Sequence, residues 1–121
     1  MDKLYITGDL VYIHGSLRII SNCDGYYATY YDENESLQEV NVNVIEGIPI
    51  TPEILEKNGW KKFKRPYSSD YCYRRKGYPT LNIRSEKEVY FHWGDQDESI
   101  TTVHQLQHLL FGLELNSEME V

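Results

Sequence analysis

The chain has 121 residues, of which 40% are apolar and 13% aromatic, and a formal net charge of −7. This composition predicts one globular domain over residues 1–121 and argues against a disordered chain. The acidity argues against general, charge-driven binding to nucleic acid. No apolar run approaches the roughly 18 residues that a membrane-spanning helix needs.

The first third of the chain alternates turn and strand signals. Asp24-Gly25 is a hairpin signal, and Val40, Val42 and Val44 alternate with asparagines as in a half-buried strand. A small curled antiparallel sheet or a partial SH3-like barrel is therefore expected. Its four short strands are predicted over residues 10–13, 16–21, 26–31 and 40–44.

A short helix is predicted over residues 52–58. Thr51 is a good N-cap, Pro52 suits the first helical position, and Gly59 can end the helix in the left-handed conformation. A helix this short needs tertiary packing to persist. The expected anchors are Ile54, Leu55 and Trp60.

Residues 63–78 are predicted to form a strand, a loop and a strand. A hairpin is expected next, with strands at 80–84 and 88–93, and residues 94–98 are interpreted as a polar break. The last element is a helix over residues 102–113, because Thr102 and Gln105 have capping-box spacing. Residues 1–6 and 114–121 are expected to be frayed. The apolar helix face comprises Val103, Leu106, Leu109, Leu110 and Leu113.

Residues 57–87 are strongly basic within an acidic chain. They hold ten of the twelve Lys and Arg residues and two acids, which gives a local charge of +8, and aromatic residues are interleaved among them. Cations that hold phosphates beside rings that stack on bases are typical of an anion or nucleic-acid surface. The candidate residues for such a site are Lys61, Lys62, Lys64, Arg65, Tyr71, Tyr73, Arg74, Arg75 and Lys76.

Two other interpretations of the basic segment stay open. The segment can neutralise its own acidic flanks, since residues 1–56 carry a net −8 and residues 88–121 a net −7. It can also face an acidic partner surface. Two clusters, 61–65 and 74–76, are the parts expected to converge if a binding patch exists.

The polar face of the last helix is a second candidate surface. His104 and His108 are four positions apart, so a helix places both rings on one side. That spacing can hold a metal, but no third ligand is adjacent, so a partner surface is the favoured interpretation and no metal is predicted. Phe111 adds an apolar group there. The candidate partner-binding residues are His104, Gln107, His108 and Phe111.

No complete catalytic or cofactor motif is present. The chain lacks a nucleotide-binding glycine loop, and Ser16, Ser36, Cys23 and Cys72 have no nucleophile signature around them. We therefore expect a protein that is not an enzyme and needs no cofactor. The two cysteines are interpreted as free thiols in the reducing cytoplasm, because the start of the chain lacks a signal-peptide pattern.

Two stretches carry a resemblance to a known group of proteins. They are Ile48-Pro49-Ile50-Thr51-Pro52-Glu53-Ile54-Leu55-Glu56-Lys57-Asn58-Gly59-Trp60 and Val103-His104-Gln105-Leu106-Gln107-His108-Leu109-Leu110-Phe111-Gly112-Leu113. The pair resembles small uncharacterised proteins of phages and prophages in Bacteroidales-type gut bacteria, whose usual pattern has Asn where this chain has His108. The resemblance implies a phage or prophage origin and the host cytoplasm, and it carries no known activity.

The function predicted from the sequence is therefore binding. The leading hypothesis is a non-enzymatic phage-type protein that engages a host or phage protein, as an inhibitor or accessory factor. The alternative is nucleic-acid or nucleotide binding through residues 57–87. No membrane association is expected.

Overall fold

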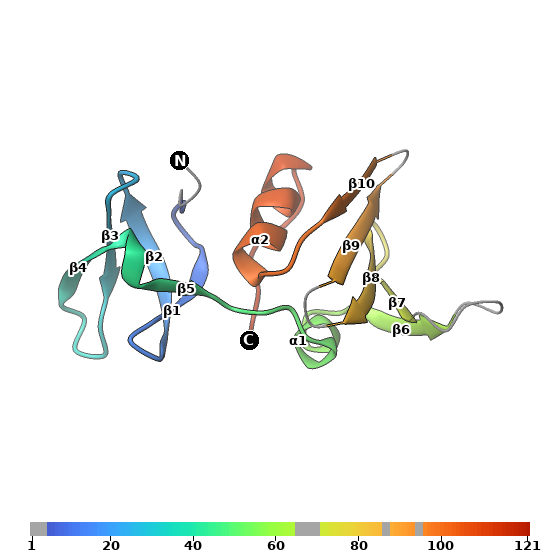
Figure 1. Cartoon of the computed structure of the whole chain (residues 1–121), viewed down its shortest axis with the longest axis horizontal. Helices are drawn as coiled ribbons and strands as arrows, with labels where there is room; N and C mark the ends of the chain where they lie inside the picture. Colours follow the sequence, from blue (N-terminus) through green and yellow to red (C-terminus); the bar gives the residue numbers. More distant parts are fainter. Residues whose placement is uncertain (1–4, 65–70, 86–87, 94–95) are drawn as a thin grey trace. The chain divides into compact units, whose positions relative to one another are not determined.

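The computed structural model describes residues 5–64, 71–85, 88–93 and 96–121, with the backbone alone for 64, 71, 84, 85, 88, 92, 93 and 96–98. The protein has the predicted α+β fold, with two antiparallel sheets, a short central helix and a C-terminal helix (Figure 1). The elements are β1 (Leu10–Ile13), β2 (Ser16–Cys23), β3 (Tyr27–Tyr31), β4 (Leu37–Asn41), the 3₁₀ helix η1 (Val42–Val44), β5 (Ile45–Gly47), α1 (Pro52–Lys57), β6 (Lys61–Lys64), β7 (Tyr71–Arg74), β8 (Thr80–Ser85), β9 (Glu88–Trp93), β10 (Gln96–Ser99) and α2 (Val103–Gly112).

The chain divides into two compact units, Met1–Ile48 and Pro49–Val121. We call them unit 1 and unit 2. Each unit contains one five-stranded sheet, and strand pairing does not pass from one sheet to the other among the described strands. The single domain expected over residues 1–121 stays a prediction.

Unit 1 is a meander that closes back onto its first strand. Its strand order is β4-β3-β2-β1-β5, so β1 pairs with β2 on one side and with β5 on the other. A two-residue turn joins β1 to β2, where His14 and Gly15 both have positive φ. The predicted Asp24-Gly25 hairpin is confirmed, because the Asp24 carboxylate accepts from the backbone N–H groups of Tyr26 and Tyr27 at 2.8 Å each.

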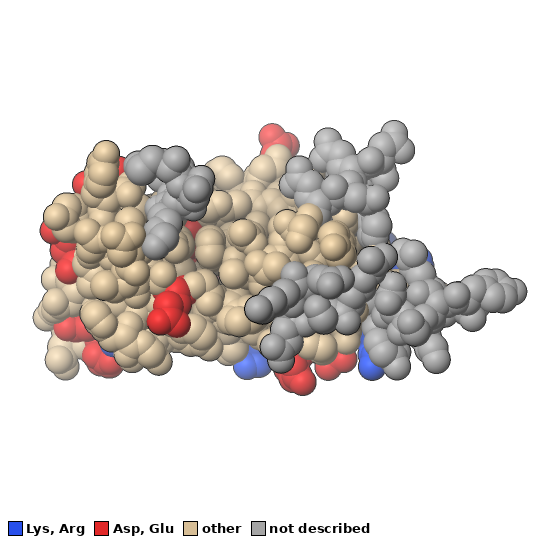
Figure 2. Space-filling model, in the orientation of Figure 1, with Lys and Arg blue, Asp and Glu red and all other residues tan. Residues whose placement is uncertain are grey.

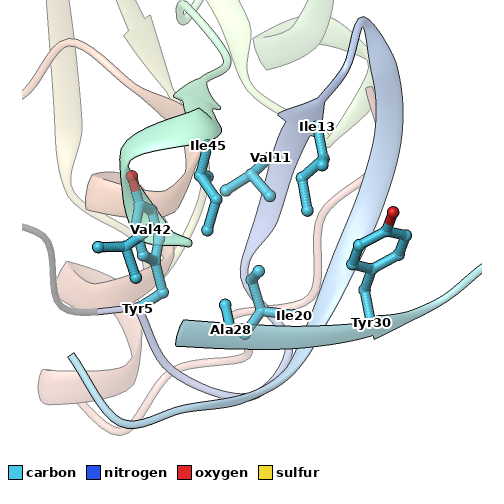
Figure 3. Packing of buried hydrophobic residues seen from close by; sticks show 8 residues of the cluster. All are labelled: Tyr5, Val11, Ile13, Ile20, Ala28, Tyr30, Val42 and Ile45. Atoms are coloured by element: carbon cyan, nitrogen blue, oxygen red, sulfur yellow. The ribbon is translucent and has the colours of Figure 1, made fainter. Parts of the chain in front are cut away.

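The core of unit 1 fills the inner face of this sheet (Figure 3). Alternation along β1 and β2 sends Val11, Ile13 and Ile20 inward, where each is at most 1% exposed. Side chains from the neighbouring segments complete the cluster. The full set is Tyr5, Val11, Ile13, Ile20, Ala28, Tyr30, Val42 and Ile45.

The predicted strand over residues 40–44 is wrong in its second half. The strand β4 ends at Asn41, and the next three residues form η1. The Asn41 side chain accepts from the Asn43 backbone N–H at 2.9 Å and so favours the 3₁₀ turn over a continued strand. Only Val42 of the three alternating valines is fully buried, and Val44 is exposed.

Unit 2 contains the sheet β10-β9-β8-β7-β6, a meander of consecutive antiparallel strands. The predicted hairpin is confirmed as β8 and β9. The predicted polar break is wrong over residues 96–98, because they belong to β10, which pairs with β9 from Gln96↔Trp93 to Ser99↔Tyr90. Backbone pairing with an existing strand overrides the low strand propensity of Asp and Glu.

Both predicted helices form; the Thr51 cap of α1 is complete, and the Thr102 hydroxyl at the start of α2 makes no capping hydrogen bond. The Thr51 hydroxyl accepts from the Ile54 N–H at 3.3 Å, and Gly59 follows α1 with φ +97°. The anchors Leu55 and Trp60 are at most 1% exposed. At α2, the Gln105 side chain accepts from the Thr102 N–H at 3.2 Å, as the capping-box spacing predicts.

The segment after α2 is held against α1, where fraying was predicted. The Asn58 side chain donates to the Glu120 carbonyl at 2.7 Å and accepts from the Glu120 N–H at 2.8 Å. Lys57 donates to the Val121 carbonyl at 3.1 Å. These bonds satisfy backbone groups of the tail that the sequence alone leaves to water. At the other end of the chain, Tyr5 belongs to the core of unit 1.

Candidate functional site

The outer face of the unit 1 sheet is unusually apolar. Ile19 on β2 and Tyr31 on β3 flank the inward-facing pair Ile20↔Tyr30, so both point to the other face. Leu37 on β4 is directly opposite Tyr31, and directly opposite residues share a face. Ile19, Tyr31 and Leu37 are 60%, 58% and 57% exposed. Together with Leu17, which is also exposed, they form the surface that we call the apolar face.

A depression of about 490 Å³ lies beside the apolar face. The turn before β1 forms one wall of this depression. The Asp9 carboxylate accepts from the Ile6 N–H at 2.9 Å, and this hydrogen bond fixes the turn. The Thr7 hydroxyl then donates to the Ser21 carbonyl at 2.8 Å and ties the wall to β2. The lining residues are Thr7, Gly8, Leu17, Arg18, Ile19, Ile20, Ser21 and Tyr31.

Acidic residues gather near the turn that joins β3 to β4. Glu33 accepts from Arg18 at 2.6 Å, and this hydrogen bond lowers the pKa of the Glu33 carboxyl. Backbone N–H groups of Ser36 and Asn34 lower the pKa of Asp32 in the same turn. Both carboxyls are therefore ionised at neutral pH. On the side drawn in Figure 2, acidic residues predominate over basic ones on unit 1.

The two predicted basic clusters of unit 2 meet each other. Lys61 on the edge strand β6 is directly opposite Arg74 on β7, and Phe63 is opposite Cys72, so these four residues share one face. The Arg74 guanidinium lies over the Phe63 ring, 4.5 Å from its centroid. Lys61 and Arg74 are exposed and form no ion pair with any acidic side chain that the structure describes.

Several predicted anion-site residues are not part of this arrangement. Tyr73 is 2% exposed, so its ring is not accessible for the predicted stacking on a base. Lys62 is opposite Tyr73 and therefore belongs to the other face of the sheet. Lys76 is exposed in the turn after β7. The side chains of Lys64 and Tyr71, and Arg65 as a whole, lie outside the described residues.

The Arg75 side chain packs against aromatic rings within unit 2. Its guanidinium lies 3.8 Å from the centroid of the Tyr78 ring and 5.1 Å from that of Trp60, which itself packs edge-on against Tyr78. Gly59 makes room for this stack, because an added Cβ would lie 3.3 Å from the Arg75 Nε. The stack explains part of the aromatic interleaving in the basic segment as internal cation–π packing.

The predicted partner-binding residues on α2 differ in their exposure to solvent. Gln107 is 4% exposed and donates to the Ser117 carbonyl at 3.1 Å, so its side chain is not accessible to a partner. Phe111 is 66% exposed and remains available. The rings of His104 and His108 lie 5.8 Å apart, edge to face, and both residues are half-buried.

The described residues contain no group of three or more His, Cys, Asp or Glu side chains placed to hold a metal ion. Cys23 and Cys72 are both free thiols, and Cys72 is fully buried. Among the helices of the described ranges, none has the length and apolar character needed to cross a membrane.

Sequence reasoning missed the apolar face, although a signal for it exists. In β2, Leu17 and Ile19 alternate with Arg18 and Ile20, so both faces of the strand carry large apolar residues. The sequence predicts the strand but does not tell which apolar set is buried. The core takes Ile20, and Leu17 and Ile19 are left on the outside.

No protein-family model, curated protein or solved structure matches this chain.

Proposed function

We propose that the chain is a non-enzymatic binding protein that engages another protein through the apolar face of unit 1. One observation carries the proposal: Ile19, Tyr31 and Leu37 share a sheet face and are each more than half exposed. Monomeric soluble proteins rarely expose contiguous apolar surface of this kind unless it binds a partner. Tyr is also favoured in interfaces, because its ring is rigid and its hydroxyl stays polar.

The chemistry of the surroundings suggests what kind of partner fits. The depression beside Ile19 accepts an apolar side chain. Asp32, Glu33 and Glu35 of the β3–β4 turn outnumber Arg18, which lines the depression and pairs with Glu33, so the net negative charge favours basic residues next to it. The proposed partner is therefore a protein segment with an apolar anchor flanked by Lys or Arg. The resemblance to phage and prophage proteins is the basis for proposing a host or phage protein in the host cytoplasm, with this chain as inhibitor or accessory factor.

The test is a pull-down from host lysate with the tagged full chain, followed by calorimetry with the purified partner. Ile19→Glu places a charge on the apolar face, and we expect it to weaken binding about tenfold or more. Val44→Glu is the matched control. It makes a similar change at an exposed aliphatic residue of the same unit, in η1 rather than on the apolar face.

The expected result is a stoichiometric partner that Val44→Glu retains and Ile19→Glu loses, with both variants folded by circular dichroism. A partner that binds Ile19→Glu as tightly as the original chain would contradict the proposal. Equal loss with both variants would do the same, because it would show that unit 1 is not recognised through this face.

A further inference from the structure

We infer that unit 2 carries a separate binding site for single-stranded nucleic acid, formed by Lys61, Phe63 and Arg74. The site does not depend on the apolar face of unit 1, because all three residues belong to β6 and β7. The inference starts from their placement. Lys61 and Arg74 are directly opposite in the ladder, and Phe63 follows on the same face two residues along β6.

The placement of these two cations opposite each other destabilises the folded chain when no anion is bound. Like charges directly opposite on neighbouring strands repel each other. No acidic side chain in the described ranges forms an ion pair with either of them. An anion that accepts hydrogen bonds from both cations would remove the repulsion, so the pair favours a negatively charged ligand.

The aromatic ring indicates which kind of anion fits. Phe63 is 42% exposed, and the guanidinium of Arg74 lies 4.5 Å from the centroid of its ring. Such stacking orients the guanidinium while its N–H donors remain suited to phosphate oxygens. An exposed ring beside cations is the arrangement that binds single strands, where bases stack on aromatic faces and cations hold the backbone.

The shape of the site favours an extended strand over a free nucleotide or a duplex. Phe63 belongs to the edge strand β6 and is 42% exposed, so a ligand can approach its ring from solvent. A long duplex would bring many phosphates close to a chain with a net charge of −7. A short single strand can engage the pair of cations with fewer such contacts.

Fluorescence anisotropy with a short labelled oligothymidylate, and with the corresponding oligouridylate, tests the site in the full chain. We expect binding at low salt that weakens as salt rises, with a logarithmic slope of about −1.4 for two phosphate contacts. Lys61→Ala should reduce the magnitude of that slope by about 0.7. Phe63→Ala should weaken binding about tenfold or more with the slope unchanged, because it removes stacking and no charge.

The matched control is Lys62→Glu against Lys61→Glu. Both make the same charge change on β6, but Lys62 belongs to the opposite face. Lys61→Glu should abolish binding, and Lys62→Glu should leave it within about twofold. Phe63→Tyr, which keeps an aromatic ring, should bind like the original chain, and circular dichroism of Phe63→Ala shows whether that variant is folded.

Three outcomes would overturn the inference. They are no binding of either oligonucleotide at low salt, equal losses from Lys61→Glu and Lys62→Glu, and unchanged affinity in Phe63→Ala. The first would identify the cations as a solvated edge that protects β6 from pairing with other chains. The second would indicate diffuse attraction to the whole basic segment.

Discussion

Asn58 joins two parts of unit 2 through one side-chain amide. Its Nδ2 donates to the carbonyls of Ile54 and Glu120 at 2.7 Å each, and its Oδ1 accepts from the Glu120 N–H at 2.8 Å. An amide suits this position because it offers donors and an acceptor together, as a peptide group does. One residue therefore satisfies a carbonyl near the end of α1 and fixes the tail.

We predict that Asn58→Asp lowers the free energy of unfolding by about 1–3 kcal/mol. The substitution keeps the size and the acceptor but removes both donors and places a carboxylate oxygen against two carbonyls. Urea unfolding measures the loss. In a chain that lacks residues 116–121 the same substitution should cost less, because the Glu120 contacts are already gone. An equal loss in both chains would show that the tail contributes nothing through Asn58.

At the scale of elements, local signals decide the helices and tertiary pairing decides the last strand. The six residues of α1 are too few to persist alone, so the Thr51 cap and the burial of Leu55 and Trp60 hold it in place. The strand β10 has no comparable local signal. It exists because its backbone pairs with β9, and pairing of this kind is not encoded in its own four residues.

Thr51→Ala should lower the free energy of unfolding by about 1 kcal/mol, because the Ile54 N–H loses its side-chain acceptor. Thermal or urea unfolding of the purified variant measures the effect. Thr51→Ser keeps a capping hydroxyl and should recover most of the stability. If Ser and Ala variants were equally destabilised, the methyl group of Thr51 rather than its hydrogen bond would be the stabilising feature.

At the scale of the whole molecule, the chain consists of two units with different surfaces. Unit 1 has an open five-stranded sheet, its own core, and a surface that carries exposed apolar residues and acidic residues. Unit 2 holds nearly all of the basic residues and both helices. The proposed protein site and the proposed nucleic-acid site fall on different units, so a variant of one site should leave the other site unaffected.

A substitution that creates a cavity in the core of unit 1 tests whether the two units unfold separately. Ile20 is fully buried, and Ile20→Ala should lower the stability of unit 1 by about 2–5 kcal/mol. Amide hydrogen exchange should then rise across β1 to β5 and change much less across β7 to β9, because each sheet has its own ladder. A uniform rise over both sheets would instead support the single cooperative domain expected from chain length.

The sequence by itself determined the features whose physics is local. The Thr51, Pro52 and Gly59 signals placed α1, Asp24-Gly25 placed a hairpin, and the apolar period placed α2, because capping, turn geometry and helical spacing act within a few residues. The α+β class followed from these elements. The SH3-like barrel and the phage resemblance stay predictions.

Only the tertiary structure decided which side of each element is covered. Burial of Tyr73 and Gln107 removed two predicted binding residues, and exposure of Ile19 revealed a surface that alternation alone leaves ambiguous. Strand register likewise decided which face each basic residue occupies: Lys61 lies opposite Arg74, and Lys62 belongs to the other face. Burial and register depend on neighbours distant in the chain, and for that reason the candidate sites required the fold.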